Sequence, residues 1–355
     1  VMDIIKTEML EVRRKYTDER RTEIAAVEDE IETLDLIQEE DMVVTMTHFG
    51  YVKRLSKSTY RAQKRGGKGV MAAATRDEDY VEQMYVVSTH DPILFFTNRG
   101  RVYQLGCHEI PEASRTARGT AVVNLLQLDG GEKVTVMLPM PRERVEGHYL
   151  VMATKNGLIK RTSLDEFANL RKSGLIAIVL REDDELIRVA LTDGSFDILL
   201  GTRDGMAIRF PETDMRPIGR AAMGVKAIEL DEDDEVVDMT PVEEDAQVLS
   251  ITELGYGKRT RPEEYRVQSR GGKGIKAMNL TDKTGRMCCQ LPVHEEEDIL
   301  LITDDGTIIR MPVDDISTLG RNTQGVRLMR VEAGCKVVGV ARAEADEEIA
   351  DDEEN

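Results

Sequence analysis

The segment Leu94-Phe95-Phe96-Thr97-Asn98-Arg99-Gly100-Arg101-Val102-Tyr103 contains the pattern that decides the fold of this chain. An apolar run leads to a threonine, two further residues lead to a glycine, and a second strand-like run follows. This pattern predicts a β-hairpin, because glycine readily adopts the positive φ of a tight turn and the threonine hydroxyl can bond to the turn backbone. Six such pairs occur in the chain: Thr47–Gly50, Thr97–Gly100, Thr154–Gly157, Thr202–Gly205, Thr252–Gly255 and Thr303–Gly306.

Each hairpin begins a repeat, since the turn glycines are 50, 57, 48, 50 and 51 residues apart. A second glycine follows each turn glycine after 17 to 19 residues. More strand-like runs, such as Ala121–Leu126 and Val225–Ile228, come after it, so each repeat should contain about four strands. We expect the apolar first strand of each hairpin to be the inner strand. The second glycines are Gly69, Gly119, Gly174, Gly224, Gly274 and Gly325.

Six units of four strands predict an all-β, six-bladed propeller-like ring, which leaves few sheet edges open. A linear β-solenoid is the alternative architecture. We place the ring at 38–342, after a helical segment and linker at 1–37 and before an acidic tail at 343–355. The predicted repeats are 42–88, 92–141, 149–193, 197–241, 247–293 and 298–342.

The net charge of −19 lies mostly at the two ends of the chain. Val1–Asp41 and Ala343–Asn355 each carry −8, which leaves only −3 on the remaining residues. The C-terminal segment should be disordered. It either aids solubility or acts as a tethered polyanion that competes for the basic surface of the repeats.

The N-terminal segment predicts one or two amphipathic helices. Apolar residues recur at alternating intervals of three and four, first from Met2 to Tyr16 and again from Ile24 to Leu34. Such a seam needs a partner surface, either another chain or the body of this one. Because the sequence starts inside the seam, we expect it to be a fragment of a longer protein.

Several classes of protein are disfavoured by composition. Four cysteines without CxxC spacing and five scattered histidines argue against structural zinc and disulfides, and fit a reducing cytosol. No apolar run is long enough for a membrane span. Trp is absent and aromatic residues make up 4%, which disfavours a base-stacking platform. No pattern of nucleophile and base suggests a self-contained enzyme.

Two repeats carry a glycine-rich basic loop, which we call a box. Glycines let the backbone approach another surface and expose N–H groups, while arginine and lysine add positive charge, so the boxes predict phosphate binding. A solvated turn is the simpler alternative for one such loop. The residues are Gln63, Lys64, Arg65, Gly66, Gly67, Lys68 and Gly69 in the first box, and Gln268, Ser269, Arg270, Gly271, Gly272, Lys273 and Gly274 in the second.

The other repeats carry fewer bases at corresponding places. If these places lie on one rim, the bases form a positive belt that binds the phosphates of bent duplex DNA without reading its sequence. A protein-interaction propeller with basic loops is the alternative. Before the second glycine lie Arg115, Arg118, Arg171, Lys172, Arg216, Arg220 and Arg321. The hairpin ends add Lys53, Arg54, Lys160, Arg161, Arg209, Lys258, Arg259 and Arg310.

These residues resemble the C-terminal domain of the bacterial DNA gyrase A subunit. Gln63–Gly69 is similar to the signature box of that family, with Lys64 in place of an arginine, and Asp18–Ile24 resembles the end of its coiled-coil segment. The topoisomerase IV A subunit is the nearest relative of that family; the intact first box and the six repeats favour gyrase.

The resemblance implies a β-pinwheel, in which neighbouring blades exchange strands. It also implies DNA wrapping that gives an ATP-hydrolysing type IIA topoisomerase its directional negative supercoiling. The implied partners are duplex DNA, the gyrase B subunit, and the rest of the A subunit in an A2B2 assembly, in the bacterial cytoplasm at the nucleoid. The catalytic tyrosine, Mg²⁺ and ATP belong to parts outside this fragment, so it has no catalytic residue, metal or cofactor of its own.

We predict that removing Glu344–Asn355 tightens DNA binding at low salt, because a tethered polyanion competes with DNA for cations. Filter-binding titrations of the full and shortened chains would measure this. Equal affinities would reduce the tail to a solubility device.

Overall fold

The computed structural model describes residues 1–18, 22, 33–57, 79, 81–114, 116–140, 146–168, 170, 173–243, 245–305, 307–332 and 334–344. The chain divides into two units, Val1–Gln38 and Glu39–Asn355. The first unit contains helix α1 (Met2–Tyr16), as its apolar seam predicts, and a 3₁₀ turn at Thr33–Leu36. No residue of α1 is buried. The seam predicted at Ile24–Leu34 lies almost entirely outside the described residues.

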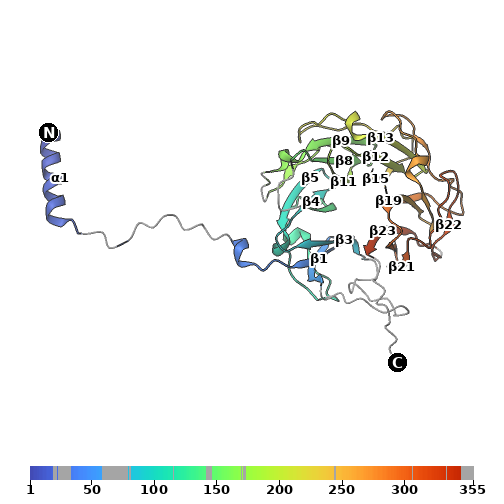
Figure 1. Ribbon diagram of the computed structural model, residues 1–355, viewed down its shortest axis with the longest axis horizontal. Coiled ribbons are helices and arrows are strands. Elements are labelled where there is room, and N and C mark those ends of the chain that lie inside the picture. The colour runs from blue at the N-terminus through green and yellow to red at the C-terminus, as the bar shows by residue number, and fades with distance from the viewer. Residues whose placement is uncertain are drawn as a thin grey trace, which may run out of the picture. The chain divides into compact units, whose positions relative to one another are not determined.

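The second unit is a six-bladed β-propeller, so the ring is confirmed over the solenoid (Figure 1). Each blade begins with an antiparallel hairpin. The first hairpin strands are β1 (Asp41–Thr47), β4 (Pro92–Thr97), β8 (Tyr149–Thr154), β12 (Asp197–Thr202), β16 (Gln247–Thr252) and β20 (Glu297–Thr303). The second are β2 (Tyr51–Ser56), β5 (Arg101–Gly106), β9 (Leu158–Ser163), β13 (Met206–Pro211), β17 (Tyr256–Thr260) and β21 (Ile308–Pro312).

The hairpin turns form as the Thr–Gly pattern predicts. The turn glycines Gly50 and Gly100 have φ of +77° and +73°, and Gly157, Gly205 and Gly255 are alike. The threonine hydroxyl accepts a hydrogen bond from the residue after the glycine, for example from Leu158 N to Thr154 Oγ1 at 3.1 Å. The sixth turn glycine lies outside the described residues.

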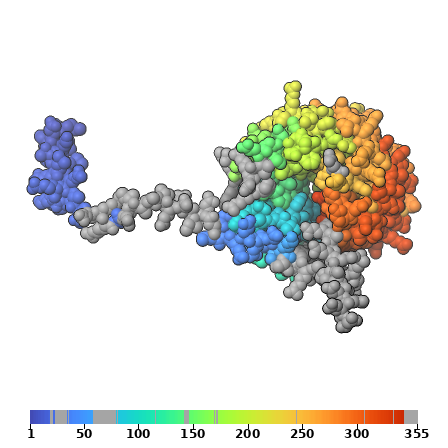
Figure 2. Space-filling view, in the orientation of Figure 1, coloured from blue at the N-terminus to red at the C-terminus, as the bar shows by residue number. Residues whose placement is uncertain are grey.

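The inner strand is the last strand of each repeat, so our prediction that the apolar hairpin strand is innermost was wrong. The inner strands pack against one another around the centre, and β23 meets β3 to close the circle (Figure 1). Figure 2 shows the repeats following one another around the disc in order of colour. The inner strands are β3 (Val81–Ser88), β7 (Val134–Pro139), β11 (Leu186–Thr192), β15 (Val236–Val242), β19 (Met287–Val293) and β23 (Val337–Glu344).

The fourth strand of a blade comes from the next repeat, which confirms the strand exchange. It is only two residues long and directly follows the second glycine. Ala121–Leu126, predicted as a strand, contributes only Ala121 to a strand and forms a 3₁₀ turn at Val122–Asn124. In blade 6 the described residues form three strands, in the order β21-β20-β23. The exchanged strands are β6 (Thr120–Ala121), β10 (Leu175–Ile176), β14 (Val225–Lys226), β18 (Ile275–Lys276) and β22 (Val326–Arg327), which pair with β2, β5, β9, β13 and β17.

The second glycine is required because the exchanged strand approaches the neighbouring hairpin very closely. A Cβ on Gly119 would lie 2.7 Å from the carbonyl oxygen of Val52, and one on Gly325 would lie 2.6 Å from that of Gly257. Short 3₁₀ turns after the hairpins lead toward these glycines, at Cys107–Glu109, Leu164–Phe167, Glu212–Asp214 and Pro262–Glu264.

The hydrophobic core lies between adjacent blades. One cluster joins Val44 of blade 1 to Phe95 of blade 2, and another joins Leu249 of blade 5 to Ile299 of blade 6. Strand β23 extends the last blade to Glu344, where Ala343 and Glu344 pair with Asp298 and Glu297. Residues 343 and 344, predicted as the start of the tail, are therefore part of the sheet. Residues 345–355 lie outside the described residues.

We predict that Gly325→Ala destabilises the propeller by about 1–3 kcal/mol, because Gly325 has a φ of +75° and lies against Gly257. Gly219→Ala is the matched control, since a Cβ there would meet nothing within 4 Å. Urea unfolding would compare the two variants. Equal losses would show that the close approach of the exchanged strand does not require glycine.

Candidate nucleic-acid interface

Three lysines predicted as phosphate contacts are buried, which corrects that prediction. Lys53, Lys160 and Lys258 are 2%, 1% and 0% exposed. Each Nζ donates to backbone carbonyls in the segment before the second glycine of the next repeat. Lys160, for example, bonds to Ala222 O at 3.1 Å and also to Arg220 O. These ammonium groups therefore hold a neighbouring loop and are not displayed at the surface.

Burial also shifts the acid–base behaviour of these lysines. It lowers the pKa of Lys160 to about 8 and that of Lys258 to about 8, and it lowers the pKa of Lys53. Desolvation disfavours the charged form of an amine, and the positive charge of Arg220 adds to the effect at Lys160. Lys160 and Lys258 therefore remain largely protonated at neutral pH.

The arginines at the hairpin ends also make internal contacts. Arg54 Nε donates to Ile110 O at 2.6 Å, and Arg259 Nε donates to Ile316 O at 2.7 Å. Arg209 donates to Asp197 and to Pro262 O. The Arg161 guanidinium lies over the Tyr149 ring and 3.6 Å from a Glu212 carboxylate oxygen. Arg310 is more exposed and pairs with Asp298 at 2.6 Å. Most of this set therefore ties each hairpin to the segment that follows the next one.

The arginines four residues before the second glycine lie at the outer edge of the ring. Arg270 Nη1 donates to Lys226 O at 3.1 Å, and Arg321 Nη1 donates to Lys276 O at 2.8 Å. Both carbonyls belong to exchanged strands, which end the β-sheets on the outside (Figure 1). The loop of one repeat is thus fastened to the exchanged strand of the repeat before it. Arg220 occupies the same place one repeat earlier and lies 3.7 Å from Glu166.

The second box forms part of this edge. Gly271 has a φ of +84° and donates its N–H to Ala227 O. Gln268 N donates to Arg209 O at 2.8 Å, which fixes the start of the loop. Lys273 projects outward with 65% of its side chain exposed. Glycine thus allows a tight loop that presents Arg270 and Lys273 at its surface.

Three further exposed bases lie beside these loops: Lys226 and Lys276, which our site prediction omitted, and Arg327, which the sequence places just after Gly325. Each stands two residues after a second glycine, on an exchanged strand. That spacing was visible in the sequence, but their place at the outer edge depends on the strand exchange. We call the whole set the outer-edge row: Arg220, Lys226, Arg270, Lys273, Lys276, Arg321 and Arg327.

The acidic partners of this row are exposed. Lys273 Nζ lies 3.2 Å from an Asp231 carboxylate that is 78% exposed, and Lys226 lies 3.5 Å from Glu229. Such surface pairs contribute at most about 1 kcal/mol and weaken with salt. A phosphate could therefore replace these carboxylates at small cost.

The remaining predicted residues have different positions. Arg118 is partly exposed, lies 3.6 Å above the Tyr51 ring and lies 3.9 Å from Asp79. Arg216 is exposed. Other predicted positions lie outside the described residues: the first box Gln63, Lys64, Arg65, Gly66, Gly67, Lys68 and Gly69, and also Arg115, Arg171 and Lys172.

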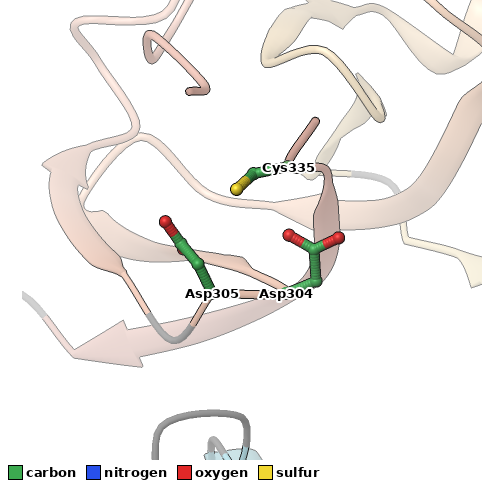
Figure 3. A group of neighbouring side chains, drawn as sticks. All are labelled: Asp304, Asp305 and Cys335. Atoms are coloured by element: carbon green, nitrogen blue, oxygen red, sulfur yellow. The ribbon is translucent and has the colours of Figure 1, made fainter. Parts of the chain in front are cut away.

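One group in the described part of the chain has metal-ligand chemistry: Asp304, Asp305 and Cys335 (Figure 3). Its carboxylates already accept hydrogen bonds within blade 6. Asp304 accepts from Lys336 N, and Asp305 accepts from Thr307 N. The group is therefore explained as a turn stabiliser. No helix in the described residues is long and apolar enough to cross a membrane.

The geometry thus defines a class: a six-bladed propeller with exchanged outer strands and a row of bases along its edge. The chain belongs to the family described as DNA gyrase C-terminal domain, beta-propeller, which matches residues 41–88, 91–139, 148–193, 197–243, 246–286 and 297–344.

Individual relatives agree with this membership. The DNA gyrase A subunit of Halalkalibacterium halodurans is 55% identical over 100% of this chain and 42% of its own length, and that of Staphylococcus aureus MRSA252 is 46% identical over 99% of this chain and 40% of its length. The chain thus spans about two fifths of these relatives. A solved gyrase A C-terminal domain has a TM-score of 0.72 at 26% identity, covering 86% of this chain and 100% of its own. A topoisomerase IV C-terminal domain has 0.72 at 28%, covering 88% and 95%.

We predict that Lys258→Met removes a pH dependence of stability. The pKa of Lys258 is about 8 in the folded protein and about 10.5 when unfolded, so the unfolded chain binds more protons between these values. The wild-type free energy of unfolding should therefore gain about 3 kcal/mol over the variant between pH 7.5 and 10.5. Urea titrations across this range would measure it. If the difference in free energy of unfolding between wild type and Lys258→Met does not change with pH, Lys258 is not a buried amine with a lowered pKa.

Proposed function

We propose that this domain binds duplex DNA through phosphates and wraps it around the outer edge of the propeller, without reading base sequence. The observation that carries the proposal is the fastening of each basic loop to the exchanged strand before it, as Arg270 is to Lys226 and Arg321 to Lys276. This arrangement supports a continuous row of cations across blades 3, 4 and 5. A row without a closed pocket suits the regular spacing of a DNA backbone.

The energy of bending decides whether such a row suffices. Curving about 40 bp of duplex through a half-circle costs on the order of 10 kcal/mol, since the persistence length of DNA is about 150 bp. A single arginine cannot offset this. Contacts distributed around the ring can, at roughly 1 kcal/mol each for about ten phosphates. The outer-edge row contributes seven bases, and the predicted positions outside the described residues would add others.

Within a complete gyrase A subunit, the wrapped DNA would favour one direction of strand passage and so support negative supercoiling. Cleavage, Mg²⁺ and ATP would belong to the rest of that polypeptide and to the gyrase B subunit, so this chain would contribute binding and not catalysis. The names of its relatives support assembly with those partners.

We predict that Arg270→Gln combined with Lys276→Gln lowers affinity for a duplex of about 40 bp, and lowers the slope of log affinity against log salt by about two. Both residues lie on the outer edge. Lys133→Gln, a change to an exposed lysine before inner strand β7, is the control for loss of charge elsewhere on the domain. Fluorescence anisotropy over a salt series would measure all three proteins, and the control should keep the wild-type slope.

A wild-type affinity that is insensitive to salt, or equal for duplexes of about 40 and about 15 bp, would overturn wrapping. Loss of a protein partner in the double variant, with DNA affinity unchanged, would favour a protein-interaction propeller.

Wrapping has a topological signature as well. A nicked circle religated with the domain bound should show a changed linking number, because a wrapped path traps writhe. Gel analysis of the topoisomers would reveal the size and sign of that change. An unshifted distribution at saturating protein would argue for binding without wrapping.

A further inference from the structure

The buried lysines occur at one position of the repeat and only in alternate repeats. Lys53, Lys160 and Lys258 each stand three residues after the turn glycine of repeats one, three and five. In repeats two, four and six the same position holds Tyr103, Ile208 and Ile309. The ring therefore alternates between blades with and without a buried cation.

The carbonyls that receive the ammonium groups are also equivalent. All three lysines bond to the carbonyl two residues before the second glycine of the next repeat, which belongs to Ala117, Ala222 or Thr323. Lys160 and Lys258 also bond to the carbonyl four residues before it, which is that of Arg220 or Arg321. The same contact thus recurs at independent places around the ring.

These contacts satisfy the ammonium group with neutral acceptors. Lys258 bonds to Gly320 O at 2.8 Å, to Thr323 O and Oγ1 at 3.2 Å each, and to Arg321 O. Lys160 has Ala177 O at 2.8 Å as its third acceptor. Several carbonyls that converge on one point need a cation, because their dipoles repel one another and burial leaves them without water. The lysine therefore acts as an internal counter-ion of the loop.

The loop so held presents an arginine of the outer-edge row. Arg321 is fixed at three points. Its backbone N–H donates to a Glu264 carboxylate oxygen at 2.9 Å, and its backbone carbonyl accepts from Lys258 Nζ. Its guanidinium donates to Lys276 O. Removing the ammonium would free one of these points. The guanidinium would then lose its fixed place next to Lys276.

We propose that Lys160 and Lys258 are positioning residues for phosphate binding, which fix the backbone of Arg220 and Arg321, and that Lys53 does the same for the loop at Ser114–Ala117. This inference rests on the proposed function, because it concerns how the cations that meet DNA are held. The lysines themselves are buried and touch no phosphate.

The loops of repeats three and five are held by other contacts, since the hairpins of repeats two and four carry no buried lysine at this position. The Tyr103 ring lies against Gly174, where a Cβ would come within 2.6 Å of the ring. In the second box, Arg270 itself bonds to Lys226 O and Asp214 O. These loops should not depend on the buried lysines.

The first test is a double-mutant cycle on DNA affinity with Lys258→Met and Arg321→Gln. If Lys258 acts through Arg321, each variant loses about five-fold in affinity and the double variant loses no more than either. Losses that multiply would overturn the proposal. Ile208→Met changes the same strand position in an alternate repeat and should leave affinity unaltered.

The second test separates this proposal from the proposed function. Amide hydrogen exchange should accelerate at Gly320–Gly325 in Lys258→Met and remain unchanged at Gly271–Gly274. Unchanged exchange at Gly320–Gly325 would overturn the positioning role. Faster exchange in a protein whose wild type binds no DNA would instead overturn the proposed function and leave the loop-holding contact in place.

Chemical rescue distinguishes the loss of the ammonium group from misfolding of the variant. Lys258→Ala leaves a space lined by carbonyl oxygens, which methylammonium can enter and donate to, whereas tetramethylammonium has no N–H to donate. DNA affinity of Lys258→Ala should rise in methylammonium relative to tetramethylammonium at equal ionic strength, and affinity of Arg321→Gln should not. Equal affinities for Lys258→Ala in the two salts would count against a cation-dependent loop.

Discussion

The close approach of the second glycine to the preceding hairpin is the constraint on which the rest of this structure depends. At Gly119, Gly224 and Gly325 a Cβ would come within 2.7 Å of a backbone oxygen of the neighbouring repeat. Only a residue without a side chain allows the next two residues to pair with that hairpin. The pairing then sets where the basic loop begins, how it bonds to its neighbour, and which side chains reach the outer edge.

One sequence pattern supplies two kinds of cation with opposite duties. Most bases that follow the turn glycine are shielded from solvent and bond to the next repeat, as Lys258 and Arg259 do. Bases next to the second glycine face outward, as Arg270 and Lys276 do. Lys226 and Lys273 have exposed carboxylate partners that salt and phosphate can displace, whereas the buried lysines bond to backbone carbonyls inside the protein.

Much of the fold could be predicted from the sequence because glycine recurs at fixed places in each repeat. The repeat length, the six blades and the hairpin turns all follow from Gly100 and its counterparts. The site was less accessible. A lysine beside an arginine at the end of a hairpin is typical of an exposed basic patch. Nothing in the local sequence shows that Lys160 is instead buried and bonded to the carbonyls of Ala177 and Ala222. Strand order was also misjudged, because Leu94–Phe96 is apolar on both faces for contact with two neighbouring blades, not for a place at the centre.

Strand exchange affects how the protein folds while it is synthesised on the ribosome. A blade receives its outermost strand from the following repeat, so its sheet stays incomplete until roughly 35 residues beyond its inner strand have been synthesised. Completion of each blade thus lags translation by one repeat. The hairpin of β17, for instance, waits for Val326 and Arg327, and its edge is open to other chains in the meantime.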